Sequence, residues 1–270
     1  MSLAAGVALV WPAGAGAQTG VVSPALATAL ATAPATPRSP AISPLSLTDS
    51  TSPTAAWRAV GLPGKAVPLT AMDMVTLEGA RVLRLRTQGS YGTLVHAVAP
   101  WVPGPDASLR WRWRLEQPLV GADLRRKDGD DAALKVCVMF DLPLQGVPFV
   151  ERSLLRMARA ASSEPLPAAT VCYVWDTTLA RDTRLANPFS GRVRYLVADG
   201  ADSPAGHWRL QQRRLADDFL QLFGEESSTV PAIIAVAVGA DADNTVGRSL
   251  AYIADLTLSP DSTNPKETLK

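Results

Sequence analysis

Apolar and charged side chains alternate most strictly in Leu109–Leu115, where leucine or tryptophan takes every second position and arginine lies between them. Because successive side chains of a strand point to opposite faces, this pattern predicts a strand with one face in the core and the other in water. Val82–Arg86 and Arg192–Val197 alternate more loosely, with glycines nearby as turn signals, and Tyr252–Leu258 ends the series. We therefore expect several half-buried strands.

Three further segments are almost continuously apolar and rich in β-branched residues: Leu134–Phe140, Thr170–Trp175 and Ile233–Val238. Runs of this length and composition are typical of strands that are covered on both sides or central to a layer. We expect these three segments to form the core.

Two segments have helical periodicity. Val150–Ala161 is predicted to be a surface helix with an apolar stripe opposite a basic one. The apolar stripe consists of Val150, Leu154, Met157 and Ala161, and the basic stripe consists of Arg152, Arg156 and Arg159. Asp217–Gly224 starts with acidic residues and ends with glycine, which is typical of a short capped helix. The basic stripe either meets an anionic polymer or is a solvated helix face, and the second meaning is the commoner one.

Many short strands, long connections and only two helices predict an all-β protein. We expect an antiparallel two-sheet β-sandwich of jelly-roll type, with one or two short inserted helices. No strand–helix–strand rhythm that would favour a parallel sheet is visible.

The two ends of the chain have a different composition from the middle. Residues 1–17 are predicted to be a secretory signal peptide, because an uncharged apolar stretch ends in Ala15-Gly16-Ala17; the alternative is an Ala-rich tail. Residues 18–55 are rich in Ala, Thr, Ser and Pro and are predicted to be a disordered linker. The folded domain is expected over 56–260, followed by a flexible tail over 261–270. We accordingly expect a periplasmic or secreted protein with no membrane span.

Composition narrows the function classes. The chain has 270 residues, of which 47% are hydrophobic and 19% charged, so it can bury a core. A net charge of +1 gives no excess of positive charge, and nucleic-acid binding by bulk electrostatics is therefore not expected. Two cysteines and two histidines are too few for a structural zinc cluster. No serine-hydrolase or zinc-protease motif is present.

Acidic residues gather at predicted strand ends. Asp130 and Asp131 precede one core strand, and Asp241, Asp243 and Asn244 follow another. Calcium takes six to eight oxygen ligands, which converging loops of a sandwich can supply, so a structural calcium site is a hypothesis for the second group. The alternative for any one cluster is that these side chains cap turns.

Tryptophans next to polar residues suggest a glycan site, because flat aromatic faces stack on sugar rings. Trp175 and Trp208 are the candidates for the rim of such a site, with Asp130, Asp131 and Asp176 as polar ligand-binding candidates. Core packing is the alternative for each tryptophan, and it is the expectation for Trp111 and Trp113.

Cys137 and Cys172 lie inside two of the apolar segments. They pair if the strands are neighbours in one sheet and the compartment is oxidising; otherwise they are buried thiols, which we slightly favour.

Several segments together resemble a bacterial secreted family known only as a domain of unknown function, number three-zero-four-seven. They are Trp111-Arg112-Trp113, Asp130-Asp131 leading into Lys135–Phe140, Tyr173-Val174-Trp175, Asn187-Pro188-Phe189, Trp208–Asp218, and Asp241–Thr245 followed by Ala251–Asp255. The resemblance implies a jelly-roll or galactose-binding-like sandwich. In such folds an Asp of the final strand often ligates structural calcium, which makes Asp255 a metal candidate by similarity. It implies almost nothing about activity.

Three functions compete. The first is a non-catalytic module that binds a glycan or a cell-envelope polymer. The second is a carboxylate-dependent polysaccharide lyase or hydrolase, which requires that Asp130, Asp131 and Asp241 converge in a cleft, with Asp176 as a further carboxylate. The third is a structural envelope protein, for which a flat surface without a groove would speak.

Overall fold

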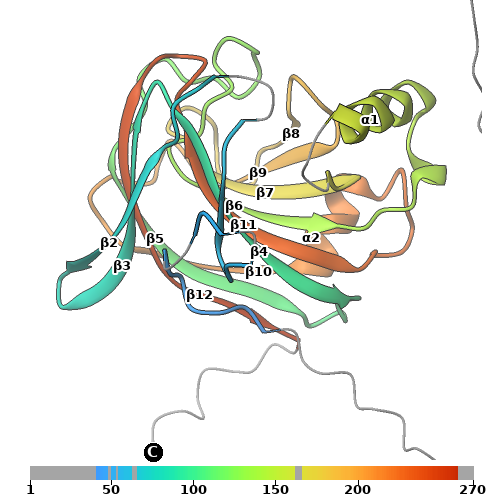
Figure 1. The fold of residues 1–270 in the computed structure, drawn as a ribbon, viewed down its shortest axis with the longest axis horizontal. Helices are drawn as coiled ribbons and strands as arrows, with labels where there is room; N and C mark the ends of the chain where they lie inside the picture. The colour runs from blue at the N-terminus through green and yellow to red at the C-terminus, as the bar shows by residue number, and fades with distance from the viewer. Residues whose placement is uncertain (1–40, 48–49, 53, 63–65, 162–165, 261–270) are drawn as a thin grey trace, which may run out of the picture. The chain divides into compact units, whose positions relative to one another are not determined.

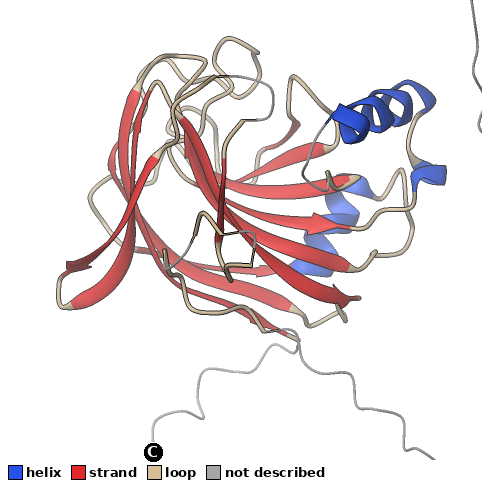
Figure 2. Ribbon diagram, viewed as in Figure 1, coloured by secondary structure: helices blue, strands red, loops and turns tan. Residues whose placement is uncertain are grey.

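The computed structural model describes residues 41–47, 50–52, 54–62, 66–161 and 166–260 (Figure 1). The predicted signal peptide, most of the predicted linker and the predicted tail lie outside these residues. Figure 2 shows two β-sheets, with both α-helices on the right of the view. Among the described residues, no helix has the length and apolar character that a membrane span requires. The all-β sandwich predicted from the sequence is confirmed.

One sheet has five strands: β2 (Ala71–Leu77), β3 (Ala80–Gln88), β5 (Ser108–Gln117), β10 (Arg209–Arg214) and β12 (Arg248–Ser259). Their order is β10-β5-β12-β3-β2, and every neighbouring pair is antiparallel. We call it the five-stranded sheet.

The other sheet has seven strands: β1 (Arg58–Val60), β4 (Tyr91–Trp101), β6 (Lys135–Phe140), β7 (Ala169–Trp175), β8 (Arg184–Ala186), β9 (Val193–Asp199) and β11 (Ile233–Asp241). Their order is β1-β4-β11-β6-β7-β9-β8. The sheets are antiparallel, as predicted, with one exception: β7 and β9 run parallel. The short strand β8 lies between β7 and β9 in the sequence and pairs antiparallel with β9. The chain therefore reverses its direction twice, so that β9 runs in the same direction as β7.

The core lies between the two sheets and is built on aromatic side chains. Trp111 and Trp113 of β5 are completely buried, as their alternation with arginine predicts. Trp111 packs on Tyr173 of β7 with ring centroids 5.2 Å apart, and Trp113 packs on Trp175 at 5.8 Å. The strand alternation therefore places these large side chains in one continuous layer.

A fully buried carboxylate joins the sheets at one end of the core. Asp199 closes β9 and accepts hydrogen bonds from Trp113 Nε1 at 2.6 Å and Gln211 Nε2 at 2.7 Å, both from the five-stranded sheet. Arg181 and Arg209 supply the compensating positive charge. A buried carboxylate needs such partners to be stable.

Residues 41–47, which precede the domain predicted over 56–260, pack on that domain. Ile42, Leu45 and Leu47 pack against the core, and the Trp57 indole donates to the carbonyl of Ser43 at 2.9 Å. The composition of residues 18–55 hides this segment, since Ile42, Leu45 and Leu47 are interspersed with Ser and Pro.

Both predicted helices are present, α1 (Phe149–Ala161) and α2 (Leu215–Phe223), and a 3-10 turn, η1, spans Leu144–Gly146. Helix α2 buries Phe219 and Phe223 completely. In α1, by contrast, Leu155 is the buried residue, and the stripe predicted to be apolar is exposed at Val150, Leu154 and Met157. The side chain of Ala161 lies outside the described residues.

Candidate functional site

A groove of about 810 Å³ lies on the face of the seven-stranded sheet that points away from the core. Strand alternation sends Lys135 and Cys137 of β6, Cys172 of β7 and Tyr195 of β9 to this face, and all four line the groove. Helix α1, the loop 187–191 and the connection after β11 contribute to its walls. Pockets for small ligands commonly measure about 300–1,000 Å³, so this groove is of ligand size.

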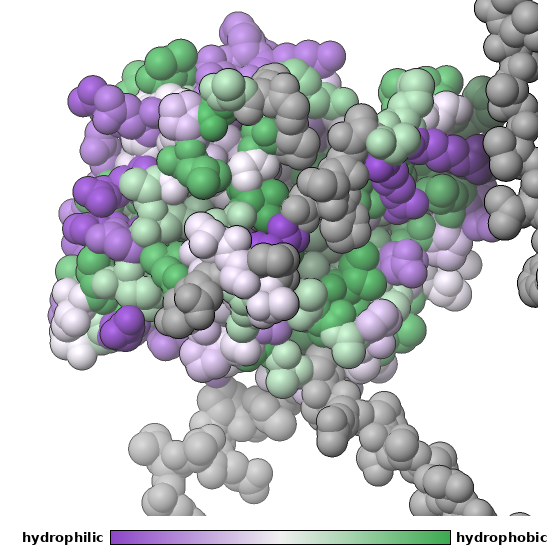
Figure 3. Space-filling view, viewed as in Figure 1, coloured by the Kyte–Doolittle hydropathy of each residue, from purple (hydrophilic) through white to green (hydrophobic). Residues whose placement is uncertain are grey.

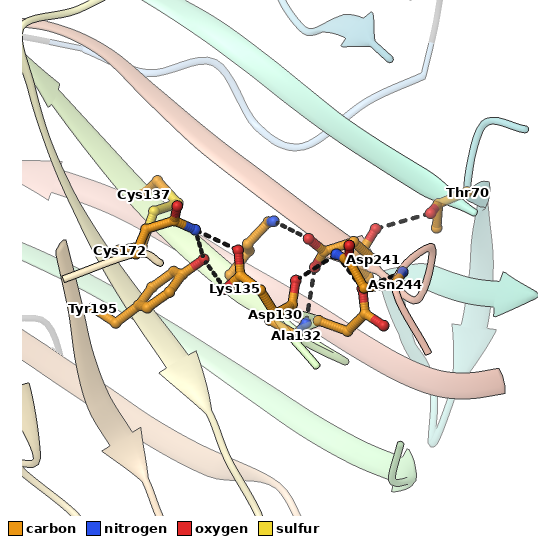
Figure 4. A network of polar contacts seen from close by, with 12 residues as sticks. Thr70, Asp130, Ala132, Lys135, Cys137, Cys172, Tyr195, Asp241 and Asn244 are labelled. Carbon is orange, nitrogen blue, oxygen red and sulfur yellow. Dashed lines mark hydrogen bonds and ion pairs between the residues drawn. A yellow bond between two sulfur atoms is a disulfide. The ribbon is translucent and has the colours of Figure 1, made fainter. Parts of the chain in front are cut away.

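One part of the groove floor is a polar network centred on Asp130 (Figure 4). The Tyr195 hydroxyl donates to Asp130 Oδ1 at 2.9 Å, and Asn187 Nδ2 donates to Oδ2 at 2.5 Å. Asn187 Nδ2 also lies 2.7 Å from the Tyr195 hydroxyl. These three side chains come from separate segments and hold each other in place.

The environment of Asp130 shifts the pKa of its carboxyl group. Its side chain is buried, and this desolvation raises the pKa of Asp130 to about 6, although the hydrogen bond from Tyr195 and the charge of Lys135 act in the opposite direction. The carboxyl group therefore changes protonation state near pH 6.

Next to Asp130 lies a buried ion pair. Lys135 Nζ donates to Asp241 Oδ2 at 2.8 Å, and the amide N–H of Ala132 donates to Asp241 Oδ1 at 2.9 Å. Burial by itself lowers the pKa of Lys135, but the negative charge of Asp241 outweighs it and raises this pKa, so the lysine stays charged. The ammonium group also lies 4.9 Å from the ring centroid of Tyr91.

The Asp131 carboxylate accepts hydrogen bonds from the connection between β11 and β12 and holds this connection in place. Its Oδ1 accepts from the amide N–H of Asn244 at 3.1 Å, and its Oδ2 accepts from the N–H and hydroxyl of Thr245, each at 2.6 Å. Adjacent carboxylates at positions 130 and 131 are thus tolerated because each has its own set of donors.

Two of the predicted calcium ligands, Asp241 and Asp243, lie close to Asp131, which was predicted as a ligand-binding residue and not as a metal ligand. Oxygens of Asp131, Asp241 and Asp243 lie within 4.8 Å of one another. However, the Lys135 ammonium already supplies the positive charge at Asp241, and four donor groups occupy both oxygens of Asp131. Calcium takes six to eight oxygen ligands, and a cation at Asp131 and Asp241 would have to compete with these donors.

Asp255 was predicted as a metal ligand and is placed elsewhere. It lies in β12 of the five-stranded sheet, where Arg112 Nε donates to its exposed carboxylate at 2.5 Å. Its positive φ of 54° belongs to an irregularity in the pairing of β12 with β5. Asp255 is therefore not part of the acidic group at the groove.

Comparison with known proteins identifies the family. The family model described as "Protein of unknown function (DUF3047)" matches residues 55–257. The chain belongs to this family. The match confirms the resemblance seen in the sequence, and no curated protein sequence matches this DUF3047 member.

Solved structures show distant likeness to this DUF3047 member. A family 11 carbohydrate-binding module from Clostridium thermocellum, solved with a β-1,3-1,4-mixed-linked tetrasaccharide, has 8% identity and a TM-score of 0.39, over 84% of this chain and 98% of that one. The xyloglucanase domain of NopAA from Sinorhizobium fredii has 9% identity and a TM-score of 0.40, over 75% and 92%. The Endo-D glycoside hydrolase domain from Streptococcus pneumoniae R6 has 8% identity and a TM-score of 0.34. That match covers 77% of this chain but only 22% of the length of the Endo-D chain. Such values support no conclusion about binding or activity.

The tryptophans predicted at the rim of a glycan site do not line the groove of this DUF3047 member. Trp175 is 2% exposed and packs in the core against Trp113, because β7 alternation turns it inward. Trp208 is half-buried at the five-stranded sheet, where its indole donates to Glu78 at 3.0 Å and the Arg112 guanidinium lies 4.6 Å from its ring. Trp175 is therefore a core residue, and Trp208 lies outside the groove.

Asp176 also has a local role in place of a binding one. Its buried Oδ1 accepts from the N–H and hydroxyl of Thr178 and from the N–H of Leu179, at 2.7–2.8 Å. This is a turn cap, as the alternative interpretation of the acidic residues expected.

The slightly favoured prediction of two free thiols was wrong. Cys137 and Cys172 are directly opposite each other on the antiparallel strands β6 and β7 and form a disulfide, with a Cα–Cα distance of 4.1 Å. Continuous apolar segments hide which strands are neighbours, and this adjacency decides between thiol and disulfide.

Four groove residues were not singled out as site residues from the sequence: Lys135, Asn187, Phe189 and Tyr195. Lys135 had a usable signal, since a single charge inside an apolar strand needs a buried partner. Phe189 lies two residues after Asn187; the residue is 53% exposed, and Lys127 Nζ lies 5.5 Å from its ring centroid. Tyr195 looked like any residue of an alternating strand.

Proposed function

We propose that this DUF3047 member is a non-catalytic module that binds a glycan or cell-envelope polymer in the groove of the seven-stranded sheet, outside the cytoplasm. The observation that carries the proposal is the lining: an exposed aromatic ring, Phe189, stands in the wall of a ligand-sized groove that has fixed polar groups on its floor. Sugar rings are recognised by this combination of a flat apolar face and well-placed hydrogen-bonding groups.

The floor offers both kinds of hydrogen-bonding partner that hydroxyl groups need. Asp130 is an acceptor when ionised, and the Asn187 amide and Tyr195 hydroxyl are oriented by it. Because these groups are held by one another, little side-chain entropy is lost when a ligand binds.

The disulfide between Cys137 and Cys172 supports the proposed location outside the cytoplasm. Disulfides such as Cys137–Cys172 form and persist in oxidising compartments, which include the periplasm and the extracellular space. Cell fractionation of the full-length chain tests this part separately: recovery in the cytoplasmic fraction with reduced cysteines would contradict it.

Retention on insoluble polysaccharides and envelope polymers tests binding. We expect Phe189→Ala to lower the affinity about tenfold, as for an aromatic side chain in a binding groove. Trp208→Ala is the matched control, because this aromatic residue lies on the other sheet and should leave retention unchanged. Loss of retention with Trp208→Ala but not with Phe189→Ala would move the site away from the groove, and no retention of any polymer would remove the proposal.

A lyase or hydrolase is the second candidate, favoured by one observation, the pKa of Asp130 near 6, which suits a general acid. Against it, the carboxylates of Asp131 and Asp241, which would have to supply the second catalytic group, are held by Thr245 and by the Lys135 ammonium. Release of reducing or unsaturated ends from a bound polymer, abolished by Asp130→Asn with binding retained, would establish catalysis. A purely structural role is disfavoured because the surface has a groove.

A further inference from the structure

Helix α1 presents apolar side chains to solvent. Phe149, Val150, Leu154 and Met157 are 71%, 67%, 55% and 61% exposed, whereas Leu155 is 7% exposed and faces the domain. These four are among eleven large hydrophobic side chains that are exposed in the described part of the chain. More than a third of the exposed apolar side chains therefore sit on one helix of 13 residues.

The same helix carries an excess of positive charge. Arg152, Arg156 and Arg159 lie on α1, and none of them forms an ion pair with a carboxylate in the described ranges. The acidic residue of the helix, Glu151, is paired with Arg192 of the domain and does not neutralise them. Since the whole chain has a net charge of only +1, this positive charge is a local feature.

The attachment of α1 fixes which side points outward. Leu155 is buried, Glu151 pairs with Arg192, and the Arg159 Nε donates to the carbonyl of Leu166 at 2.8 Å. At 100° per residue these three positions share one side of the helix, and Val150 and Met157 fall on the other. Figure 1 shows α1 at the margin of the domain, and Figure 3 shows apolar and strongly hydrophilic atoms next to each other there.

We propose that α1 is a membrane-docking helix that places this face on an anionic phospholipid bilayer. An interfacial helix places its apolar side chains among the acyl chains and its cations near the phosphates. On α1 the cations next to the apolar side are Arg156, which is exposed, and Arg152, whose guanidinium lies 5.7 Å from the centroid of the Phe149 ring. Arg159 is held on the domain side. The apolar side chains stand on a single helix at the margin, and a bilayer accepts such a ridge without a complementary groove.

This proposal does not depend on what the groove binds. Glu151, Leu154 and Leu155 also line the groove, so docking through α1 would hold the groove at the membrane surface. The failure of one proposal leaves the other standing, because vesicles without any glycan test docking alone.

Sedimentation of the full-length protein with vesicles is the direct test. We expect binding to vesicles of phosphatidylglycerol and phosphatidylcholine in equal parts, and binding at least about tenfold weaker to phosphatidylcholine alone. Leu154→Asp should weaken binding to the anionic vesicles about tenfold or more, and Arg156→Gln about fivefold.

Leu210→Asp is the matched control, because Leu210 is a similarly exposed leucine, at 60%, on the five-stranded sheet. Both leucine variants should unfold at the temperature of the wild type, since the side chains are exposed. Equal binding to neutral and anionic vesicles, equal loss with Leu210→Asp and Leu154→Asp, or no vesicle binding would overturn the proposal. A dimer in solution that Leu154→Asp dissociates would also overturn it, with a second copy as the occupant.

Discussion

Titration of Asp130 gives a measurable stability signature. The pKa of this carboxyl group is about 6 in the folded protein because it is buried, compared with 3.8 for a free side chain. The folded state therefore holds the proton more tightly than the unfolded state. It follows that this group makes the protein more stable at low pH, and that the gain is lost as the pH rises through about 6.

The size of the effect follows from these two pKa values. Over the whole transition it amounts to about 3 kcal/mol, and between pH 5 and pH 7.5 to about 1.4 kcal/mol. Asp130→Asn removes the titration and keeps the size of the side chain. Comparing the free energy of unfolding in urea at the two pH values should give a pH dependence that differs between wild type and variant by about 1.4 kcal/mol.

Asp128→Asn is the control for this experiment. Asp128 is two residues away, and the hydrogen bond from Arg126 lowers its pKa, so it does not titrate between pH 5 and 7.5. Its variant should therefore keep the wild-type pH dependence. If Asp130→Asn also keeps it, then burial does not shift this carboxyl group as the structure requires, and the case for a titrating groove floor is lost.

Three other predictions concern the framework of the site. Asp199→Ala removes the buried acceptor between the sheets and should lower the free energy of unfolding by about 3–5 kcal/mol in urea titrations. Asp202 is exposed, and Asp202→Ala should change this free energy by less than about 0.5 kcal/mol. Similar values for the two variants would refute the role of Asp199 in linking the sheets. Replacing Cys137 and Cys172 together by alanine opens a covalent link across 35 positions and should cost about 4 kcal/mol, which calorimetry with and without reductant checks. Because donors already occupy the carboxylates of Asp131 and Asp241, millimolar calcium should shift the melting temperature by less than about 1 °C relative to chelator, and a rise of several degrees would reinstate the calcium site.

How much of the fold the sequence reveals depends on the kind of strand. β5 and the apolar strands β6, β7 and β11 are visible from their patterns, because burial on one or both faces selects their residues. β4 was missed although it lies in the seven-stranded sheet, since close packing there requires small residues: a Cβ on Gly92 would lie 2.9 Å from the amide nitrogen of Thr70. β10 was missed because it is a polar edge strand that exists through its pairing with β5.

For the candidate site, residue type predicted the acidic cluster but not the geometry. Asp130 comes from one segment and Asp241 and Asn244 from another, and all three line one groove. The sequence could not show that Lys135 would neutralise Asp241, or that the rim aromatic would be Phe189 and not Trp175. Both outcomes depend on strand register and on the face to which each side chain turns, and one residue of shift reverses that face.

The parallel pairing of β7 and β9 separates two roles within one stretch of chain. The strands carry the core on one face, whereas the crossover between them, including Asn187 and Phe189, forms a wall of the groove. Residues added or removed between β8 and β9 would alter the width of the groove and leave the hydrogen-bond ladders of β6 and β7 in place. Under the proposed function, differences in ligand preference between DUF3047 proteins are expected to concentrate in the length and composition of this crossover.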